Sequence, residues 1–271
     1  MKIICNGATI TLPDLKGIST AGTGSTSAIE TSFLSEFKAR LTKDNQINNE
    51  ERMRAYCLNE LHKIIQGDYQ SYFEPLGGVG VTASIFSEDP LQTHLNELDD
   101  SCLNVIRQNF PTWTLYQQDM FKFEYPQNFD TIFLDFNNYT VQKYGTVYYD
   151  VVQAAAKHCN QYLIINDCSV FYLNRGAKSF ETYSKILGET VTNYDDFYPV
   201  LKEFYEEELP GWTLVRVEKF YASSYLLLVR KDLVVETVLN NPPIVRTHTS
   251  EDMKAAPVLW LEMPPKTKKL I

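Results

Sequence analysis

Short apolar or β-branched runs alternate with segments of helical periodicity between residues 71 and 231, and this alternation constrains the fold more than any other feature. The runs that read as strands are residues 71–76, 93–97, 114–118, 131–135 and 162–166. Between them, SCLNVIRQNF and TVYYDVVQAAAKHC carry apolar residues at helical spacing. Strand, crossover helix and strand in succession build a parallel sheet with helices on its faces. We therefore predict an α/β fold with a doubly wound, mostly parallel sheet.

The end of this region has a different pattern. The segment WTLVRVEKFYASSYLLLVRK contains two apolar runs joined by a short polar turn. A crossover helix does not fit between them, whereas two antiparallel strands can be joined by a turn of this length. The predicted sheet therefore finishes in an antiparallel C-terminal hairpin.

The flanking regions suggest a division into residues 1–70, 71–231 and 232–271. In the first part we expect an irregular leader and then a helical cap, with helices over about 27–41 and over NNEERMRAYCLNELHKIIQG, which places its apolar residues on one face. The last part is rich in proline and polar residues. It is predicted to be a tail packed on the surface and anchored by Leu259 and Trp260.

Composition excludes several classes of function. The 34 acidic side chains exceed the 25 basic ones, giving a net charge of −9, which argues against non-specific binding to duplex nucleic acid. No apolar run approaches the roughly 20 residues of a membrane helix, and the first residues lack the apolar block of a secretory signal. The five cysteines and four histidines are scattered, so no metal site is predicted. We expect a cytoplasmic protein that does not enter membranes.

The segment YFEPLGGVGVTASIF joins the first predicted strand of the core to a helix. Its strand ends in Glu74, and Gly77, Gly78 and Gly80 form the turn that follows. Glycines in such a turn allow the backbone to approach a ligand closely, although similar turns also serve only to connect a strand to a helix. The turn alone is weak support for a nucleotide site.

Acidic residues recur at the ends of the next three predicted strands. Glu97 ends the second, with Asp99 beside it, and Asp119 and Asp135 end the third and fourth. The carboxyl ends of parallel strands form the edge where doubly wound sheets bind ligands. Any one of these acids is more simply a helix cap or a solvated loop residue. Their repetition along one edge favours a binding site.

With these motifs, residues 71–231 resemble the class I methyltransferases that use S-adenosylmethionine, and the reversed strand of the hairpin also looks like that family's last strand. The resemblance implies S-adenosylmethionine as cofactor. The residues that it matches to cofactor binding are Glu74, Gly77, Gly78, Gly80, Glu97, Asp99, Asp119 and Met120. By the family pattern, Glu74 and the glycines would hold the methionine part, Glu97 or Asp99 the ribose, and Asp119 and Met120 the adenine.

The loop after the fourth strand, DFNNYT, would determine the methyl acceptor. In the branch of the family that methylates nucleobase amines, this loop reads as Asp or Asn, two prolines and an aromatic residue. Asp135 and Tyr139 match the catalytic acceptor and stacking positions, and Asn137 or Asn138 could add a hydrogen bond, but both prolines are missing. Three alternatives therefore stay open: methylation of a nucleobase amine in DNA or RNA, methylation of another acceptor, and a catalytically degenerate binding or assembly module. A nicotinamide-dependent oxidoreductase is disfavoured by the closing hairpin.

Overall fold

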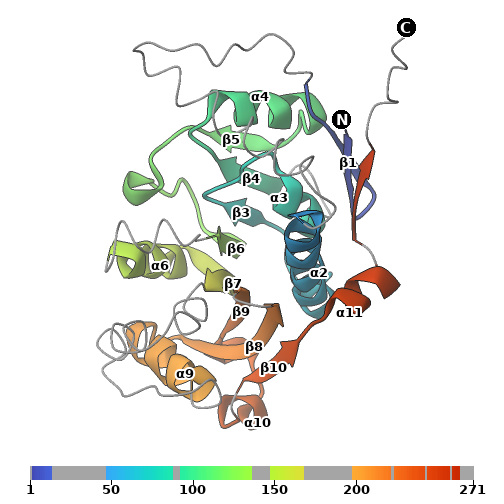
Figure 1. Cartoon of the computed structure of the whole chain (residues 1–271). Helices are drawn as coiled ribbons and strands as arrows, with labels where there is room; N and C mark the ends of the chain where they lie inside the picture. The colour runs from blue at the N-terminus through green and yellow to red at the C-terminus, as the bar shows by residue number, and fades with distance from the viewer. Residues whose placement is uncertain are drawn as a thin grey trace, which may run out of the picture.

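The computed structural model of the chain describes residues 2–13, 47–87, 92–135, 147–167, 197–220, 223–241, 243–256 and 258–262 (Figure 1). The strands are β1 (Lys2–Cys5), β2 (Ala8–Thr11), β3 (Tyr72–Glu74), β4 (Thr93–Asn96), β5 (Thr114–Tyr116), β6 (Phe129–Asp135), β7 (Cys159–Asp167), β8 (Trp212–Phe220), β9 (Ser223–Arg230), β10 (Ile244–Thr247) and β11 (Leu259–Glu262). The α-helices are α2 (Ile47–Ile65), α3 (Val81–Phe86), α4 (Asp100–Asn109), α6 (Val147–Lys157), α9 (Phe197–Glu208), α10 (Glu236–Leu239) and α11 (Ser250–Ala255), and the 3₁₀ helices are η2 (Met120–Lys122) and η3 (Lys231–Leu233).

The main sheet has eight strands in the order β10-β8-β9-β7-β6-β3-β4-β5. Its neighbouring strands run parallel except at β9, which is antiparallel to both β7 and β8. The strand order reverses beside β3, as a doubly wound sheet requires. This arrangement confirms the predicted fold class, including the antiparallel hairpin formed by β8 and β9.

Helices cover both faces of this sheet (Figure 1). Buried residues of α2, α3 and α4 share one hydrophobic cluster with one face of the strands, and buried residues of α6 and α9 share a second cluster with the other. The fully buried aromatic side chains of Tyr72 and Phe73 are consecutive in β3 and belong to different clusters, as alternation along a strand predicts. Among the described helices, none is long and apolar enough to cross a bilayer.

The flanking segments contain more regular structure than the sequence suggests. Part of the leader expected to be irregular forms β1 and β2, which pair with each other and with β11 in a separate three-stranded sheet. In the C-terminal region, expected to be a surface tail, β10 extends the main sheet in parallel beside β8, and Leu259 is buried in β11. The helix expected over 27–41 lies outside the described residues. The division at residues 70 and 231 stays a prediction.

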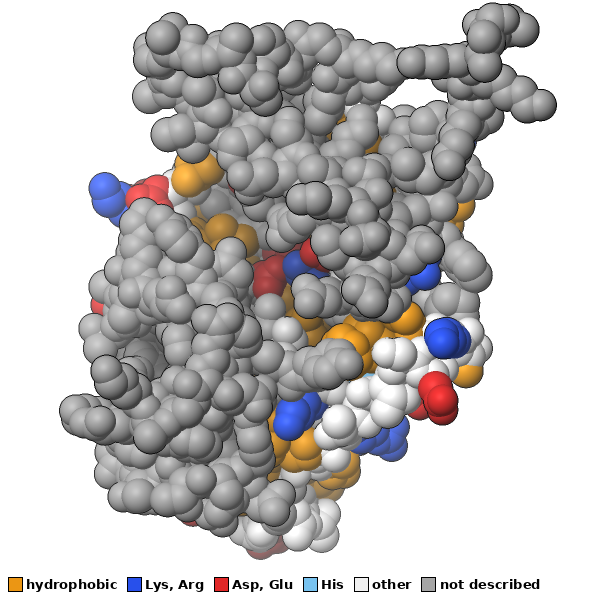
Figure 2. Space-filling model, in the orientation of Figure 1, with side chains coloured by type: hydrophobic (Ala, Val, Ile, Leu, Met, Phe, Trp, Pro, Cys, Tyr) orange, Lys and Arg blue, Asp and Glu red, His pale blue; other side chains and the backbone are white. Residues whose placement is uncertain are grey.

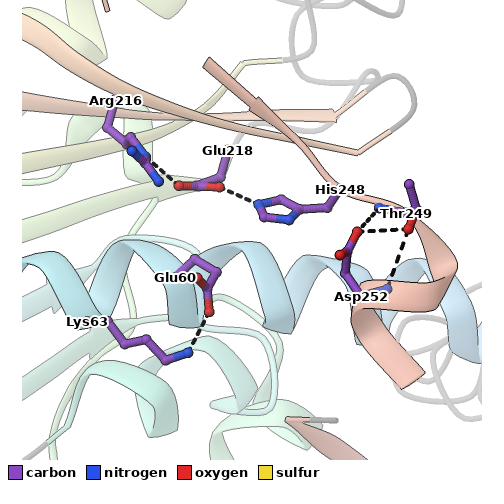
Figure 3. A network of polar contacts seen from close by, with 7 residues as sticks. All are labelled: Glu60, Lys63, Arg216, Glu218, His248, Thr249 and Asp252. Atoms are coloured by element: carbon purple, nitrogen blue, oxygen red, sulfur yellow. Dashed lines mark hydrogen bonds and ion pairs between the residues drawn. The ribbon is translucent and has the colours of Figure 1, made fainter. Parts of the chain in front are cut away.

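A buried ionic cluster connects β8 to the segment that follows β10 (Figure 3). Glu218 of β8 is fully buried, and its two carboxylate oxygens bind Arg216 Nε at 2.5 Å and His248 Nε2. The His248 ring also meets Tyr56 of α2 edge-on, with 5.1 Å between ring centroids. The Glu218 carboxylate therefore joins β8 to the segment after β10, and the His248 ring extends this contact to α2.

Candidate functional site

The glycine-rich turn after β3 lies at the carboxyl edge of the sheet. Gly77 packs so closely that a Cβ atom there would come within 2.4 Å of a Leu95 methyl carbon. Gly78 and Gly80 have φ angles of 51° and 85°, a left-handed backbone that favours glycine. A Cβ on Gly78 would meet nothing within 4 Å. The turn therefore needs its glycines for shape, and the space over Gly78 is open.

Glu74 ends β3 with a buried side chain, and its carboxylate accepts a hydrogen bond of 3.0 Å from the Tyr72 hydroxyl. Burial raises the pKa of Glu74 to about 8, with Arg54 opposing the shift and Asp135 adding to it. Because the side chain is only 1% exposed, a ligand at this edge can contact only a small part of it directly.

Glu97 follows β4 and links this strand end to the glycine turn. One carboxylate oxygen accepts the backbone N–H of Gly78 at 2.8 Å, and the other accepts that of Asp99 at 2.9 Å. Burial raises the pKa of Glu97, and these backbone hydrogen bonds oppose the rise. Each oxygen still has a lone pair to accept a further donor.

Asp99 caps the N-terminus of α4 by accepting hydrogen bonds from the backbone N–H groups of Ser101 and Cys102 through its Oδ1. Its other oxygen, Oδ2, is buried and has no hydrogen-bond partner among the described residues. An unsatisfied buried acceptor is unfavourable unless a ligand supplies the donor. Asp99 is therefore a helix cap with one acceptor to spare beside Glu97.

Two further predicted residues lie after β5. Asp119 is exposed and caps η2 by accepting the backbone N–H of Phe121 at 3.1 Å. The next residue, Met120, is buried in the cluster that contains Phe73. The strand before them ends at Tyr116, so Asp119 stands three residues beyond the strand end, whereas the sequence suggested that it follows the strand directly.

Asp135 ends β6 and is held by two partners. Its Oδ1 accepts a hydrogen bond of 2.7 Å from Asn166 Nδ2 of β7, and its Oδ2 forms an ion pair with Arg54 of α2. Figure 2 shows acidic and basic side chains next to each other near the centre of one face, beside a hydrophobic band. Asn138 and Tyr139, the other residues predicted for catalysis, lie outside the described residues.

Sequence reasoning did not identify three of the polar residues at this edge. Arg54 is one, and Asn166 is another. The third, Asn96, is buried at the end of β4, where its amide donates to the carbonyls of Pro75 and Gln118 and accepts the backbone N–H of Gln118. From the end of β4, Asn96 thereby links the segment that follows β3 to the segment that follows β5. A polar residue at or next to the last position of an apolar strand was the signal for both asparagines.

Two other features of the described residues bear on the site. No group of three or more metal-ligating side chains is found among them. A cavity of about 150 Å³ opens at the amino ends of β3 and β4, where Tyr72 and Thr93 lie in its wall. That is the opposite edge of the sheet from the carboxylates, so the cavity is separate from the site described above.

Stability is expected to depend on pH through Glu74. Its pKa is about 8 in the folded protein against 4.5 as the ordinary value, so between these values the folded chain keeps a proton that the unfolded chain loses. The free energy of unfolding should therefore fall as pH rises through this window. Denaturant unfolding at pH 5, 6, 7 and 8 would measure the slope. The variant Glu74→Gln should flatten it, and an equal slope in both proteins would contradict the assignment.

Comparisons with known proteins give structural matches only. No family model matches the sequence, and no curated protein matches it. Among solved structures, magnesium protoporphyrin IX methyltransferase (ChlM) from Synechocystis PCC 6803 is 14% identical, with a TM-score of 0.48 over 79% of this chain and 100% of that one. A S-adenosylmethionine-dependent methyltransferase from Clostridium acetobutylicum is 14% identical, with a TM-score of 0.46 over 72% and 97%.

A third match is DesVI from Streptomyces venezuelae, which is 19% identical with a TM-score of 0.38. The match covers 50% of this chain and 56% of that protein, so the chain spans little more than half of its length. All three TM-scores are below 0.5. The fold assignment therefore rests on the order and direction of the strands in the main sheet.

Proposed function

We propose that the chain is an S-adenosylmethionine-dependent methyltransferase. The observation that carries this proposal is the arrangement of Glu74, Glu97, Asp119 and Asp135 at or just beyond the carboxyl ends of four neighbouring strands, in a sheet with a reversed strand near its other end. The cofactor carries a sulfonium cation, an ammonium group and a ribose diol, and each of these favours carboxylate acceptors. A dinucleotide would instead need donors for its pyrophosphate.

The residues at this edge fit the cofactor. Glu74 and the turn of Gly77, Gly78 and Gly80 would hold the methionine part, and Glu97 with Asp99 would accept hydrogen bonds from the ribose hydroxyls. The open space over Gly78 and the unpartnered Oδ2 of Asp99 support this placement. Asp119 and Met120 would contact the adenine. When bound, S-adenosylmethionine would supply a methyl group bonded to its sulfonium sulfur, which leaves as a neutral thioether.

In the proposed reaction, Asp135 orients the methyl acceptor, with Asn138 and Tyr139 as further contacts. Alignment of acceptor and methyl group in a site without water would supply most of the rate. The DFNNYT loop matches part of the pattern of enzymes that methylate nucleobase amines, so a nucleobase amine is one candidate acceptor. The net charge of −9 favours an unpaired or small-molecule acceptor over extended duplex contacts. We propose a cytoplasmic location as well, which is favoured by the four described cysteines, because they are buried and free of disulfide bonds.

One observation favours a second candidate, a methyltransferase-like domain that binds but does not transfer. Both oxygens of Asp135 are already engaged, one by Asn166 and the other by Arg54. A carboxylate held in this way has less freedom to take a proton from an acceptor. In the second candidate the cofactor would stabilise the fold and a partner would bind at the same edge.

Methyl transfer separates the two candidates. Purified protein with methyl-labelled S-adenosylmethionine would be tested against nucleic-acid, protein and small-molecule fractions, and the label in each fraction counted. We expect Asp135→Asn to reduce transfer roughly 100-fold or more, as loss of an orienting or proton-accepting group does. The matched control is Asp130→Asn, at the amino end of the same strand, which should keep full transfer. Unchanged activity of Asp135→Asn would overturn the proposed role of this residue.

A further inference from the structure

Arg54 of α2 lies between the two parts of the candidate site. Its Nη2 donates a hydrogen bond of 3.0 Å to Thr82 Oγ1, in the first turn of the helix that the glycine turn leads into. The same Nη2 pairs with Asp135 at the end of β6. The guanidinium carbon is 6.0 Å from the ring centroid of Phe133. The cation is thus held over the sheet, between the glycine-turn helix and the proposed acceptor residue.

The guanidinium group of Arg54 has a donor that the described residues do not use. Its Nε is buried and has no hydrogen-bond partner among them. A guanidinium presents its N–H groups in a planar fork that matches a carboxylate with two parallel hydrogen bonds. An unpaired buried donor is unfavourable, so a ligand that accepts from Nε would be stabilised.

The charges around Arg54 indicate what such a ligand carries. Burial disfavours the charged guanidinium, but nearby acidic groups, Asp135 first and Glu51 second, outweigh it and raise the pKa of Arg54. These acids suit the ammonium and sulfonium groups of S-adenosylmethionine. The amino-acid part of the cofactor also carries a carboxylate, which the same acids would repel. A basic side chain among them removes that conflict.

We propose that Arg54 binds the α-carboxylate of the cofactor's amino-acid part through its guanidinium Nε, which has no partner among the described residues. The inference rests on the proposed function, because it takes S-adenosylmethionine as the ligand. It adds a residue from the helix before the core to the cofactor site. Arg54 would thereby select adenosyl ligands that carry an intact amino acid.

The test uses three ligands and the full chain. S-adenosylhomocysteine has the whole amino-acid part, its decarboxylated analogue lacks only the carboxylate, and 5′-methylthioadenosine lacks the amino-acid part entirely. Calorimetry would give the affinity of each for the wild type, Arg54→Met and Arg54→Lys. Lys63→Met is the matched control, since Lys63 is a basic residue of the same helix that is 55% exposed.

We expect wild type and Lys63→Met to bind S-adenosylhomocysteine roughly 10- to 100-fold more tightly than its decarboxylated analogue, as charged hydrogen bonds predict. In Arg54→Met this ratio should fall to about 1 to 3, while 5′-methylthioadenosine binds as in the wild type. Arg54→Lys keeps the charge without the fork, so its ratio should be intermediate. If Arg54→Met binds none of the three ligands, the affinity ratio measured for Arg54→Lys decides whether Arg54 recognises the carboxylate.

Two results would overturn the inference and leave the proposed function standing. In one, the Arg54 substitutions leave the affinity ratio of S-adenosylhomocysteine to its decarboxylated analogue unchanged. In the other, Arg54→Lys loses affinity equally for all ligands. The latter result would mean that Arg54 only fastens α2 to the sheet. If the wild type binds no adenosyl ligand at all, the proposed function fails together with this inference.

Discussion

The variant Glu97→Ala is expected to lose S-adenosylhomocysteine affinity by at least about 100-fold. In the proposed site Glu97 accepts hydrogen bonds from the ribose hydroxyls, and hydrogen bonds to a charged group contribute roughly 1.5–3 kcal/mol each. Two of them correspond to a factor of about 100 or more in the dissociation constant. Calorimetry at constant pH would measure the change.

The control for this prediction has to separate binding from local structure, because Glu97 also accepts the backbone N–H groups of Gly78 and Asp99. Asp100→Ala removes a neighbouring, exposed acid and should leave affinity within about threefold. Glu97→Gln keeps the side-chain length and one acceptor oxygen, so it can retain one of the two backbone hydrogen bonds and should lose only part of the affinity. Full affinity in Glu97→Ala would refute the ribose assignment.

The second large effect is expected on stability. Glu218→Ala should lower the free energy of unfolding by about 3–5 kcal/mol, because it leaves Arg216 and His248 without their buried counter-charge. Chemical denaturation followed by tryptophan fluorescence would measure it. Glu207→Ala, an exposed acid on α9, should change stability by no more than about 0.5 kcal/mol.

A triple variant identifies the cause of this loss. Replacing the cluster by apolar residues, as Arg216→Met, Glu218→Leu and His248→Phe, removes all three charged or titratable groups at once. Such replacements of buried ion pairs are often neutral or stabilising. Stability of the triple variant near that of the wild type would assign the loss in Glu218→Ala to the two groups left unpaired. A triple variant as unstable as Glu218→Ala would instead assign it to lost packing.

Much of the core was predictable from sequence because its strands are buried on both faces and follow one another through helices. Short runs of β-branched and aromatic residues, such as those ending at Glu74 and Asp135, favour strands when they stand between helical segments. Parallel pairing then places their ends at one edge, so Glu74, Glu97 and Asp135 could be assigned to a common edge without coordinates. The strand bounds shifted by up to three residues, since strand ends carry the weakest pattern.

The missed features depend on contacts between distant parts of the chain. β1 and β11 pair although their partners lie 254 to 260 positions apart, from Cys5 with Leu259 to Lys2 with Glu262, and four-residue strands have no periodicity to detect. All four residues of β10 are exposed, so its sequence carries no burial pattern. Arg54 reads as an ordinary polar position of an amphipathic helix. Its ion pair with Asp135 exists only because α2 packs on the same face of the sheet as α3, where Thr82 also meets it.

The pairing of β1 with β11 has a practical meaning for engineering the protein. Lys2 stands opposite Glu262 in the register, and directly opposed residues of antiparallel strands have Cα atoms about 4.5–5.5 Å apart. A short linker could join these two positions and new ends could be opened elsewhere, which would make the chain a natural subject for circular permutation.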